Sequence, residues 1–387
     1  MAKEKLAKKG KMLVVSWTVF PWATGSSVIV NNLASSYSKG ELVLFGEGHT
    51  DLSDDGWSDQ FPLIYKSHPK KYVLKRGQKI ARWFELLKVI KEIEGVIKKE
   101  HIDRILCVFP NDFYLCAAFF ASKRTQVPFY SWFHNTYLDN VSGYRKLIAR
   151  WLQPAVFRAS KKVFVMSDGM GKYMGNKYPQ YTFEVLRHGF PLPKEVSVQS
   201  VRKSEEIKTF VFTGSLNSSC EDATIRLMKV ILKNPKFVIH IYSGNNSEDF
   251  YEHGIIGQQV VFHNFTPLDR LYKELPKYDV MLLPHGFDGN RTAAEFKTIF
   301  PTRTIPLLVS GRPILAHSPK GVFFTDFLND RCCALVISEK DEGKIEEAIR
   351  VVLEDQLVIN EIVENAVQTA KLFDLNSLKA EIEKKVN

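Results

Sequence analysis

Short apolar runs alternate with amphipathic segments along almost the whole chain. The first apolar run, at 12–17, leads into a loop that contains Gly25, and apolar residues then recur at helical spacing over 28–37. Apolar runs of this length are typical of strands that a parallel sheet buries on both faces. The repeated order of strand, loop and helix predicts an α/β fold whose sheets carry helices on both faces.

The same pattern continues through both halves of the chain. We expect further strands at 42–45, 105–109, 128–133, 162–166, 209–212, 237–242, 260–262, 279–284 and 313–316. We expect further helices at 113–121, 145–159, 221–232, 268–278, 342–353 and 360–385. Residues 285–300 are polar and are expected to form a loop.

A stretch without periodicity separates the two halves. Residues 191–206 combine prolines and charges, which is typical of an interdomain linker. A chain of 387 residues is also long for a single core. We therefore expect two doubly wound, Rossmann-like domains at 12–191 and 208–365, joined by a linker at 192–207 and preceded by a basic tail at 1–11.

Positive charge is concentrated in the first half. The net charge is +10, and residues 1–200 carry 30 Lys and Arg against 17 Asp and Glu. Such an asymmetry predicts an anionic partner for the first domain, either an acidic membrane surface, a lipid-phosphate acceptor or a nucleic acid. No nucleic acid is expected as a partner, since the sequence lacks the aromatic and basic motifs of known nucleic-acid-binding modules.

The segment 66–99 is the most basic amphipathic stretch. Apolar residues recur there at helical spacing with Lys and Arg between them: Ile80, Trp83, Phe84, Leu87, Ile90, Ile93 and Ile97. One interpretation is a helix that packs on the core and leaves its charged face in water. The other is a helix whose basic face contacts anionic lipid head groups.

The sequence predicts a cytoplasmic protein, with peripheral association with the inner face of the membrane as a further expectation. The N-terminus has no apolar signal region, and no apolar run is long enough to span a bilayer. The five cysteines are odd in number and lack metal-like spacing, so we expect them to be reduced.

The stretch 300–315 carries the most informative chemistry. Pro301 suits the first turn of a helix, Gly311 suits a residue of positive φ that ends one, and a short strand follows Pro313. Free N–H groups at the helix start, together with Thr302 and Arg303, would form a site for a diphosphate. The alternative is a capped helix with a solvated arginine.

This stretch resembles the signature of family 4-like glycosyltransferases, which have the GT-B fold. The matching residues are Phe300, Pro301, Thr302, Leu308, Gly311 and Pro313. Arg303 stands where the family usually has lysine, while Pro306 and Thr298 stand where it has two acidic residues. The resemblance implies two Rossmann-like domains facing a cleft, with a C-terminal helix at 366–387 that crosses back to the first domain.

The resemblance also implies roles for individual residues. As catalytic residues it implies His134, at the end of a strand, and Arg303, although a lone histidine there is also compatible with a hydrogen-bonded loop residue. The implied donor-binding residues are Gly214, Ser215, Ser243, Gly244, Phe265, His285, Arg291, Pro301, Thr302 and Arg303. The implied acceptor-binding residues are Trp22, Gly25, Ser26, Arg187 and His188.

These residues imply a glycosyltransferase that moves a sugar from a nucleotide-diphospho-sugar to a glycan or lipid-linked acceptor. By the same resemblance we expect transfer with retention, without a metal ion and without a cofactor other than the nucleotide-sugar co-substrate. Pro306 and the missing basic pair after Gly214 leave an alternative open: a protein that binds nucleotide-sugars on a glycosyltransferase scaffold without turning them over.

Overall fold

The computed structural model describes residues 10–20, 25–48, 63–68, 82–196, 207–289 and 292–386. The chain divides into two compact units. Unit 1 comprises Met1–Pro191 and Leu375–Asn387, and unit 2 comprises Leu192–Asp374. Trp22 and Arg291, two predicted site residues, lie outside the described residues.

Unit 1 is built on a seven-stranded parallel sheet with the order β3-β2-β1-β4-β5-β6-β7. Its strands are β1 (Lys11–Val15), β2 (Leu42–Glu47), β3 (Leu63–Ser67), β4 (Ile102–Phe109), β5 (Phe129–Phe133), β6 (Val163–Val165) and β7 (Phe183–Val185). The strand order reverses between β1 and β4, so the sheet is doubly wound. In such sheets ligands bind beyond the carboxyl ends of the strands near this reversal.

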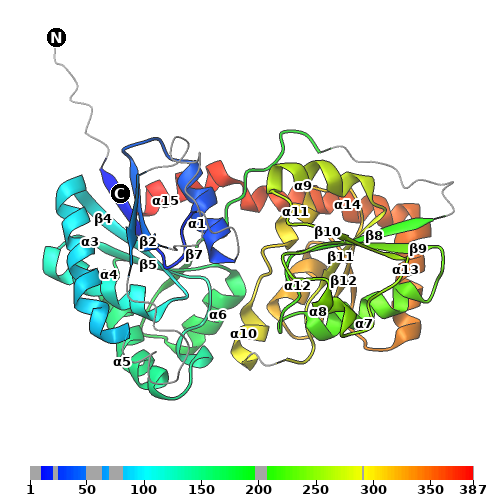
Figure 1. Ribbon diagram of the computed structural model, residues 1–387, viewed down its shortest axis with the longest axis horizontal. Helices are drawn as coiled ribbons and strands as arrows, with labels where there is room; N and C mark the ends of the chain where they lie inside the picture. The colour runs from blue at the N-terminus through cyan, green and yellow to red at the C-terminus, as the bar shows by residue number, and fades with distance from the viewer. Residues whose placement is uncertain are drawn as a thin grey trace, which may run out of the picture. The chain divides into compact units, whose positions relative to one another are not determined.

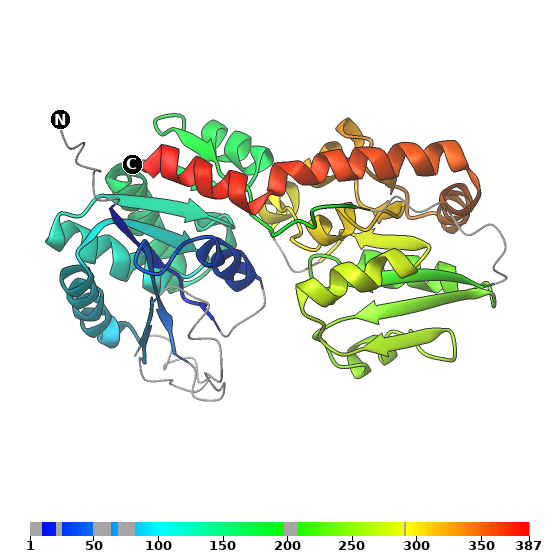
Figure 2. The same ribbon diagram turned by 90° about the horizontal axis from the view of Figure 1, so that it is seen from above.

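Helices cover both faces of this sheet. They are α1 (Ser26–Ser35), α3 (Leu86–Glu100), α4 (Asp112–Thr125), α5 (Tyr144–Ala159), α6 (Asp168–Lys177) and α15 (Leu375–Val386), with 3-10 turns η1 (Arg82–Glu85) and η2 (Leu138–Asn140). Figure 1 shows α3, α4 and α5 side by side on one face, and α1 packs with α15 on the other face, which Figure 2 shows from above.

One core cluster of unit 1 lies where the sheet meets α1 and α15. Met12 and Val14 of β1 are buried together with Leu33 of α1 and Ile382 of α15. Because α15 comes from the end of the chain, it ties the C-terminus to the first unit, as the crossing helix of the predicted fold does.

Unit 2 is built on a six-stranded parallel sheet with the order β10-β9-β8-β11-β12-β13. Its strands are β8 (Lys208–Thr213), β9 (Phe237–Tyr242), β10 (Val260–His263), β11 (Val280–Pro284), β12 (Ile314–His317) and β13 (Leu335–Ile337). Its helices are α7 (Glu221–Leu232), α8 (Glu248–Tyr251), α9 (Leu268–Glu274), α10 (Ala293–Thr298), α11 (Thr304–Leu308), α12 (Phe323–Asp330), α13 (Glu342–Glu354) and α14 (Gln356–Ala370), with 3-10 turns η3 (Leu275–Lys277) and η4 (Lys371–Phe373).

The predicted helix start at Pro301 is wrong. α11 begins at Thr304 and runs only to Leu308, and the N–H groups of Thr304 and Ile305 already donate to the carbonyls of Pro301 and Thr302. The cause is Pro306, because a helix that began at Pro301 would need an N–H at this position. Gly311 does adopt a positive φ of 69°, as predicted.

Two other predicted elements differ from the structure. The predicted loop 285–300 contains the helix α10, whose N-cap Thr292 accepts a hydrogen bond from the N–H of Glu295. The predicted helix 360–385 is interrupted at Asp374, which is extended. The interruption follows Phe373, which is buried in unit 2 and stacks on Phe300 with ring centroids 5.1 Å apart.

Two negative findings apply to the described ranges. None of the helices found there combines the length and apolar character that crossing a bilayer requires. Within the same ranges, no three His, Cys, Asp or Glu side chains gather in a way that could hold a metal ion.

Candidate functional site

Arg303 lies at the carboxyl end of the unit 2 sheet, against the loop that follows β8. Its Nη2 donates to the carbonyl of Ser215 over 2.7 Å and lies 3.5 Å from the sulfur of Cys220, the N-cap of α7. Gly214, in that loop, has φ 91°, a conformation that favours glycine, and a Cβ there would only reach ordinary van der Waals contact with the Arg303 guanidinium, 3.4 Å from Cζ. Arg303 thus contacts both the loop after β8 and the N-cap of α7.

Several buried polar atoms at this edge have no hydrogen-bond partner among the described residues. They are Oγ1 of Thr213, Nδ1 of His285, Nη1 of Arg303 and Oγ1 of Thr304. These residues come from the ends of β8 and β11 and from the start of α11. Buried polar groups are almost always paired in folded proteins. The unpaired atoms at the ends of β8 and β11 and at the start of α11 are therefore available to a polar ligand.

His285 has a defined tautomer at this edge. Its Nε2 lies 3.3 Å from the carbonyl of Phe296, an acceptor, so Nε2 carries the proton and Nδ1 is left as an acceptor. Burial lowers the pKa of His285 to about 4, with Arg303 adding to the effect and Asp222 and Phe296 opposing it. His285 is therefore neutral near pH 7, and its free Nδ1 can accept a hydrogen bond from a hydroxyl group but not from an ionised phosphate oxygen.

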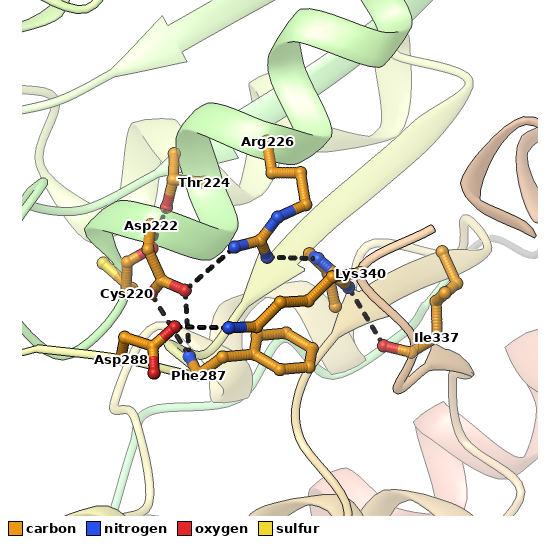
Figure 3. A network of polar contacts seen from close by, with 9 residues as sticks. Cys220, Asp222, Thr224, Arg226, Phe287, Asp288, Ile337 and Lys340 are labelled. Atoms are coloured by element: carbon orange, nitrogen blue, oxygen red, sulfur yellow. Dashed lines mark hydrogen bonds and ion pairs between the residues drawn. The ribbon is translucent and has the colours of Figure 1, made fainter. Parts of the chain in front are cut away.

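Asp222 of α7 holds the loop that follows β11 (Figure 3). Its carboxylate oxygens each accept from the N–H of Phe287 over 3.2 Å, and one also accepts from Nη2 of Arg226 over 3.2 Å. The N–H of Gly286 donates to the carbonyl of Ser219 over 2.8 Å. The backbone just after His285 is thus fixed to the start of α7.

The network continues from Arg226 to the ends of β12 and β13. Nη1 of Arg226 donates to Nε2 of His317 over 2.9 Å, and Nδ1 of His317 donates to the carbonyl of Ile337 over 3.0 Å. Burial lowers the pKa of His317 to about 4, and the Arg226 charge adds to this. Phe287 lies under the cations of Arg226 and Lys340, at 5.1 and 5.6 Å from the ring centroid. His317 is therefore neutral near pH 7. Its hydrogen bonds to Arg226 and to the Ile337 carbonyl fix the orientation of the Arg226 side chain.

Among the other predicted donor residues, Ser243, Gly244 and Phe265 follow strands at the same carboxyl edge, and no contact with Arg303 is found for them within the described ranges. Ser243 and Gly244 follow β9, and the Ser243 hydroxyl is engaged with Asn245 over 3.0 and 3.1 Å. Phe265 follows β10 and is 59% exposed, so an aromatic face is available there.

In unit 1 the structure brings three predicted residues together. Nδ1 of His134, which follows β5, lies 3.2 Å from the hydroxyl of Ser26 at the start of α1. The ring of His188 lies 5.0 Å from the ring of His134, and both pack edge-on against Trp132. Both histidines are 3% exposed, and Nε2 of each makes no hydrogen bond with any described residue.

Both histidines are neutral near pH 7. Burial, with a contribution from the neighbouring His188, holds the pKa of His134 well below its ordinary value. Burial lowers the pKa of His188 to about 3. Two buried, neutral imidazoles with free Nε2 atoms can exchange hydrogen bonds with hydroxyl groups, which both donate and accept.

Two further acceptor candidates have structural roles. Gly25 is the N-cap of α1 with φ 56° and ψ −128°, a conformation reserved for glycine. Arg187 forms an ion pair with Asp168 over 2.5 Å. The position of each residue is thus explained without an acceptor.

The sequence alone does not predict a role for Asp222, Arg226 or His317. The unpaired hydroxyls of Thr213 and Thr304 are likewise seen only in the structure. No local motif marks these residues, since their partners lie on other elements. The one available signal is their placement next to the ends of predicted strands, where side chains of an α/β sheet face ligands.

Comparison with solved structures places this geometry in a known fold. Anabaena HepE in complex with UDP and glucose is 14% identical over 97% of this chain and 99% of its own, with a TM-score of 0.69. Sucrose-phosphate synthase from Thermosynechococcus elongatus is 12% identical over 97% and 98%, with a TM-score of 0.71. A glycosyltransferase from Rickettsia africae is 15% identical over 98% and 99%, with a TM-score of 0.67.

Sequence comparison alone adds nothing to this result. No protein-family model matches the chain, and no curated protein matches it significantly. At these identities the likeness establishes the fold. With its two doubly wound, Rossmann-like units, the chain has the GT-B fold of these glycosyltransferases.

Proposed function

We propose that this protein is a glycosyltransferase that moves a sugar from a nucleotide-diphospho-sugar to a glycan or lipid-linked acceptor. The observation that carries the proposal is the group of buried, unpaired polar atoms on Thr213, His285, Arg303 and Thr304. They lie at the sheet edge where α/β units bind ligands. The proposed reaction proceeds with retention and needs neither a metal ion nor a further cofactor.

In this proposal Arg303 stabilises the leaving diphosphate. The guanidinium carries a permanent charge and has a free Nη1, while its Nη2 is fixed to Ser215. A fixed cation at the position where charge develops lowers the barrier to departure, because it needs no reorganisation during the reaction. The role assigned to the start of α11 is smaller than the sequence suggests, since its first N–H groups are engaged.

His285 and His134 contribute hydroxyl contacts. Nδ1 of His285 accepts from a sugar or ribose hydroxyl, which suits a site where the family's usual acidic residues are replaced by Pro306 and Thr298. In unit 1, Ser26 holds Nδ1 of His134, and the proposed role of the free Nε2 of His134 is to bind a sugar hydroxyl. These are the roles we propose for neutral imidazoles.

The proposed donor carries uridine diphosphate. HepE has been solved with UDP and with UDP-glucose, and it spans 97% of this chain. Phe265, exposed after β10, is the proposed stacking partner of the base.

A screen of nucleotide-sugars with a mixture of glycan and lipid acceptors tests the proposal by nucleoside diphosphate release. We expect release from a UDP-sugar, a loss of about 100-fold or more in Arg303→Ala, and an unchanged rate in the control Arg331→Ala. Arg331 is an exposed arginine of unit 2 that lies over Phe327. Binding of UDP-sugar with no release in the whole screen would favour the second candidate, a binding protein without turnover, for which Pro306 is the supporting observation.

A further inference from the structure

The guanidinium of Arg303 contacts an aromatic ring as well as the backbone. Its Cζ lies 5.0 Å from the centroid of the Phe212 ring, and its Nη2 donates to the carbonyl of Ser215 over 2.7 Å. A cation over an aromatic face is attracted by the negative charge of the π-system. Among the described residues, no carboxylate is found in contact with Arg303. The ring and the carbonyl therefore hold this side chain where a counter-ion would otherwise do so.

Phe212 itself is fixed by the core of unit 2. It belongs to β8, is fully buried and lies edge-on to Phe250, with ring centroids 6.2 Å apart. Both residues belong to one core cluster. Close packing of this kind restricts a buried ring to one rotamer. The aromatic face beside Arg303 is thus part of the rigid core, and the guanidinium that lies over it is restricted in turn.

These contacts explain why an arginine suits this position. Arg303 stands where the family that the sequence resembles usually has lysine. A guanidinium can contact a ring and donate from two nitrogens at once, whereas the ammonium of lysine is a point charge on a flexible stem. Because Nη2 is engaged by Ser215, Nη1 is left buried and without a partner among the described residues. One nitrogen therefore anchors the side chain, and the other can donate to an anion.

We propose that Phe212 is a positioning residue whose ring holds the Arg303 guanidinium in place for the diphosphate of the donor. The inference rests on the proposed function, because that function gives Arg303 the diphosphate as its ligand. Ordering a flexible side chain at the moment of binding costs affinity, and a side chain that is ordered beforehand avoids this cost. Phe212 does not itself contact the donor and acts only through Arg303.

The alternative for Phe212 is a role in the core alone, and Phe210 offers a matched control. Phe210 also belongs to β8 and to the same core cluster, is fully buried and packs against Phe237 with ring centroids 5.2 Å apart. It lies two residues, roughly 7 Å, further from the carboxyl end of the strand. Leucine in place of either phenylalanine removes the same atoms from this cluster, but only the change at 212 removes the ring beside Arg303.

Isothermal titration calorimetry of UDP and of uridine, with the full chain, tests the proposal. The variants are Phe212→Leu, Phe210→Leu and Arg303→Lys. We expect Phe212→Leu and Arg303→Lys to bind UDP about 3- to 10-fold more weakly than the wild type, the cost of ordering one arginine. Phe210→Leu should bind UDP like the wild type, and uridine should bind equally to all four proteins. The two leucine variants should lose similar amounts of Tm.

A double-mutant cycle isolates the effect of the ring on the guanidinium. In the Arg303→Ala background, Phe212→Leu should weaken UDP binding no further, since no guanidinium is left to hold. A further loss in that background would overturn the proposal, as would equal losses of UDP affinity in the two leucine variants. If Phe212→Leu does not fold, Arg303→Lys decides: UDP affinity equal to that of the wild type would show that charge alone is sufficient.

Nitrogen-15 NMR of the arginine side chains tests the position of Arg303 without a ligand. The Nε–H signal of Arg303 is identified by its absence in Arg303→Lys. We expect the ring current of Phe212 to shift this signal away from those of exposed arginines in the wild type and in Phe210→Leu, but not in Phe212→Leu. A signal among those of exposed arginines in the wild type would overturn the inference. Failure of the wild type to bind UDP, with the signal shifted as expected, would refute the proposed function instead.

Discussion

Asp222 is the side chain on which the loop after β11 most depends. Its carboxylate accepts the N–H of Phe287 and a bond from Arg226, and its charge opposes the lowering of the pKa of His285 by burial. Removing the carboxylate leaves the half-buried N–H of Phe287 without its partner and deprives Arg226 of its ion pair. The expected effect therefore reaches both the stability of unit 2 and the position of His285.

Asp222→Ala should lower the free energy of unfolding of unit 2 by about 1–3 kcal/mol. For a unit of this size, that corresponds to a fall of a few degrees in Tm. Differential scanning calorimetry measures it. Asp288→Ala is the matched control, because Asp288 belongs to the same network through Lys340 but its side chain is 72% exposed. Equal effects of the two substitutions would contradict the role given to Asp222.

The residues that sequence reasoning identifies are those with a local signature. Gly311 is recognisable because a helix must end before Pro313, and His134 because it follows an apolar run. Asp222 and His317 have no such signature, since each acquires its role from a loop or strand far away in the sequence. His285 is predicted as a donor residue, but its tautomer depends on Phe296 and needed the structure.

At the scale of elements, the start of α1 depends on the backbone of Gly25. A Cβ at this position would meet nothing within 4 Å, so space does not require glycine, but φ 56° does. Gly25→Ala should destabilise unit 1 by about 1–3 kcal/mol.

The control for this prediction is Gly95→Ala within α3. Here too a Cβ would meet nothing within 4 Å, but the backbone is helical. Alanine should therefore stabilise unit 1 by about 0.5–1 kcal/mol. Thermal unfolding measures the change in stability of both variants. If both substitutions changed the stability of unit 1 in the same direction, the positive φ of Gly25 would not be the cause of the loss in Gly25→Ala.

Elements with a clear apolar run are predicted well, whereas three of the four edge strands are not. β3, β7 and β13 are edge strands of three or five residues with half-exposed side chains, so no buried run marks them. α11 starts later than predicted because one proline, Pro306, decides where its hydrogen bonds can begin. The missing N–H of Pro306 therefore outweighs the preference of Pro301 for the first turn of a helix.

At the scale of the molecule, buried histidines link stability to pH. Burial lowers the pKa of His188 to about 3 and the pKa values of His285 and His317 to about 4, against an ordinary value of 6.5. Between pH 6.5 and about 4 the unfolded chain therefore binds protons that the folded chain does not. Stability must fall as the pH falls through this window.

Each of these histidines contributes up to about 1.4 kcal/mol per pH unit. We expect denaturant unfolding at pH 7.5, 6.5 and 5.5 to show little change over the first step and a marked loss over the second. Carboxylates titrate mostly below this range, so they do not obscure it. The transitions of the two units are best followed separately, since a two-unit chain need not unfold in one step. A flat profile would mean that these rings are accessible to protons in the folded state.

The fold as a whole is predictable from the sequence, because the alternation of strands and helices survives in both halves. Which apolar side chains are exposed at the surface is less predictable. Helical spacing assigns Phe84 and Leu87 to a core-facing side, yet both are exposed, because apolar spacing alone cannot tell a core from a contact surface.

The central claim is that unit 2 binds a nucleoside diphosphate through Arg303. Isothermal titration calorimetry of UDP and of uridine, with wild type and Arg303→Ala, tests it most directly. Arg303→Ala should weaken UDP binding by about 10- to 100-fold, the effect of a lost charge-assisted hydrogen bond, and leave uridine binding unchanged. Equal UDP affinity in the two proteins would contradict it.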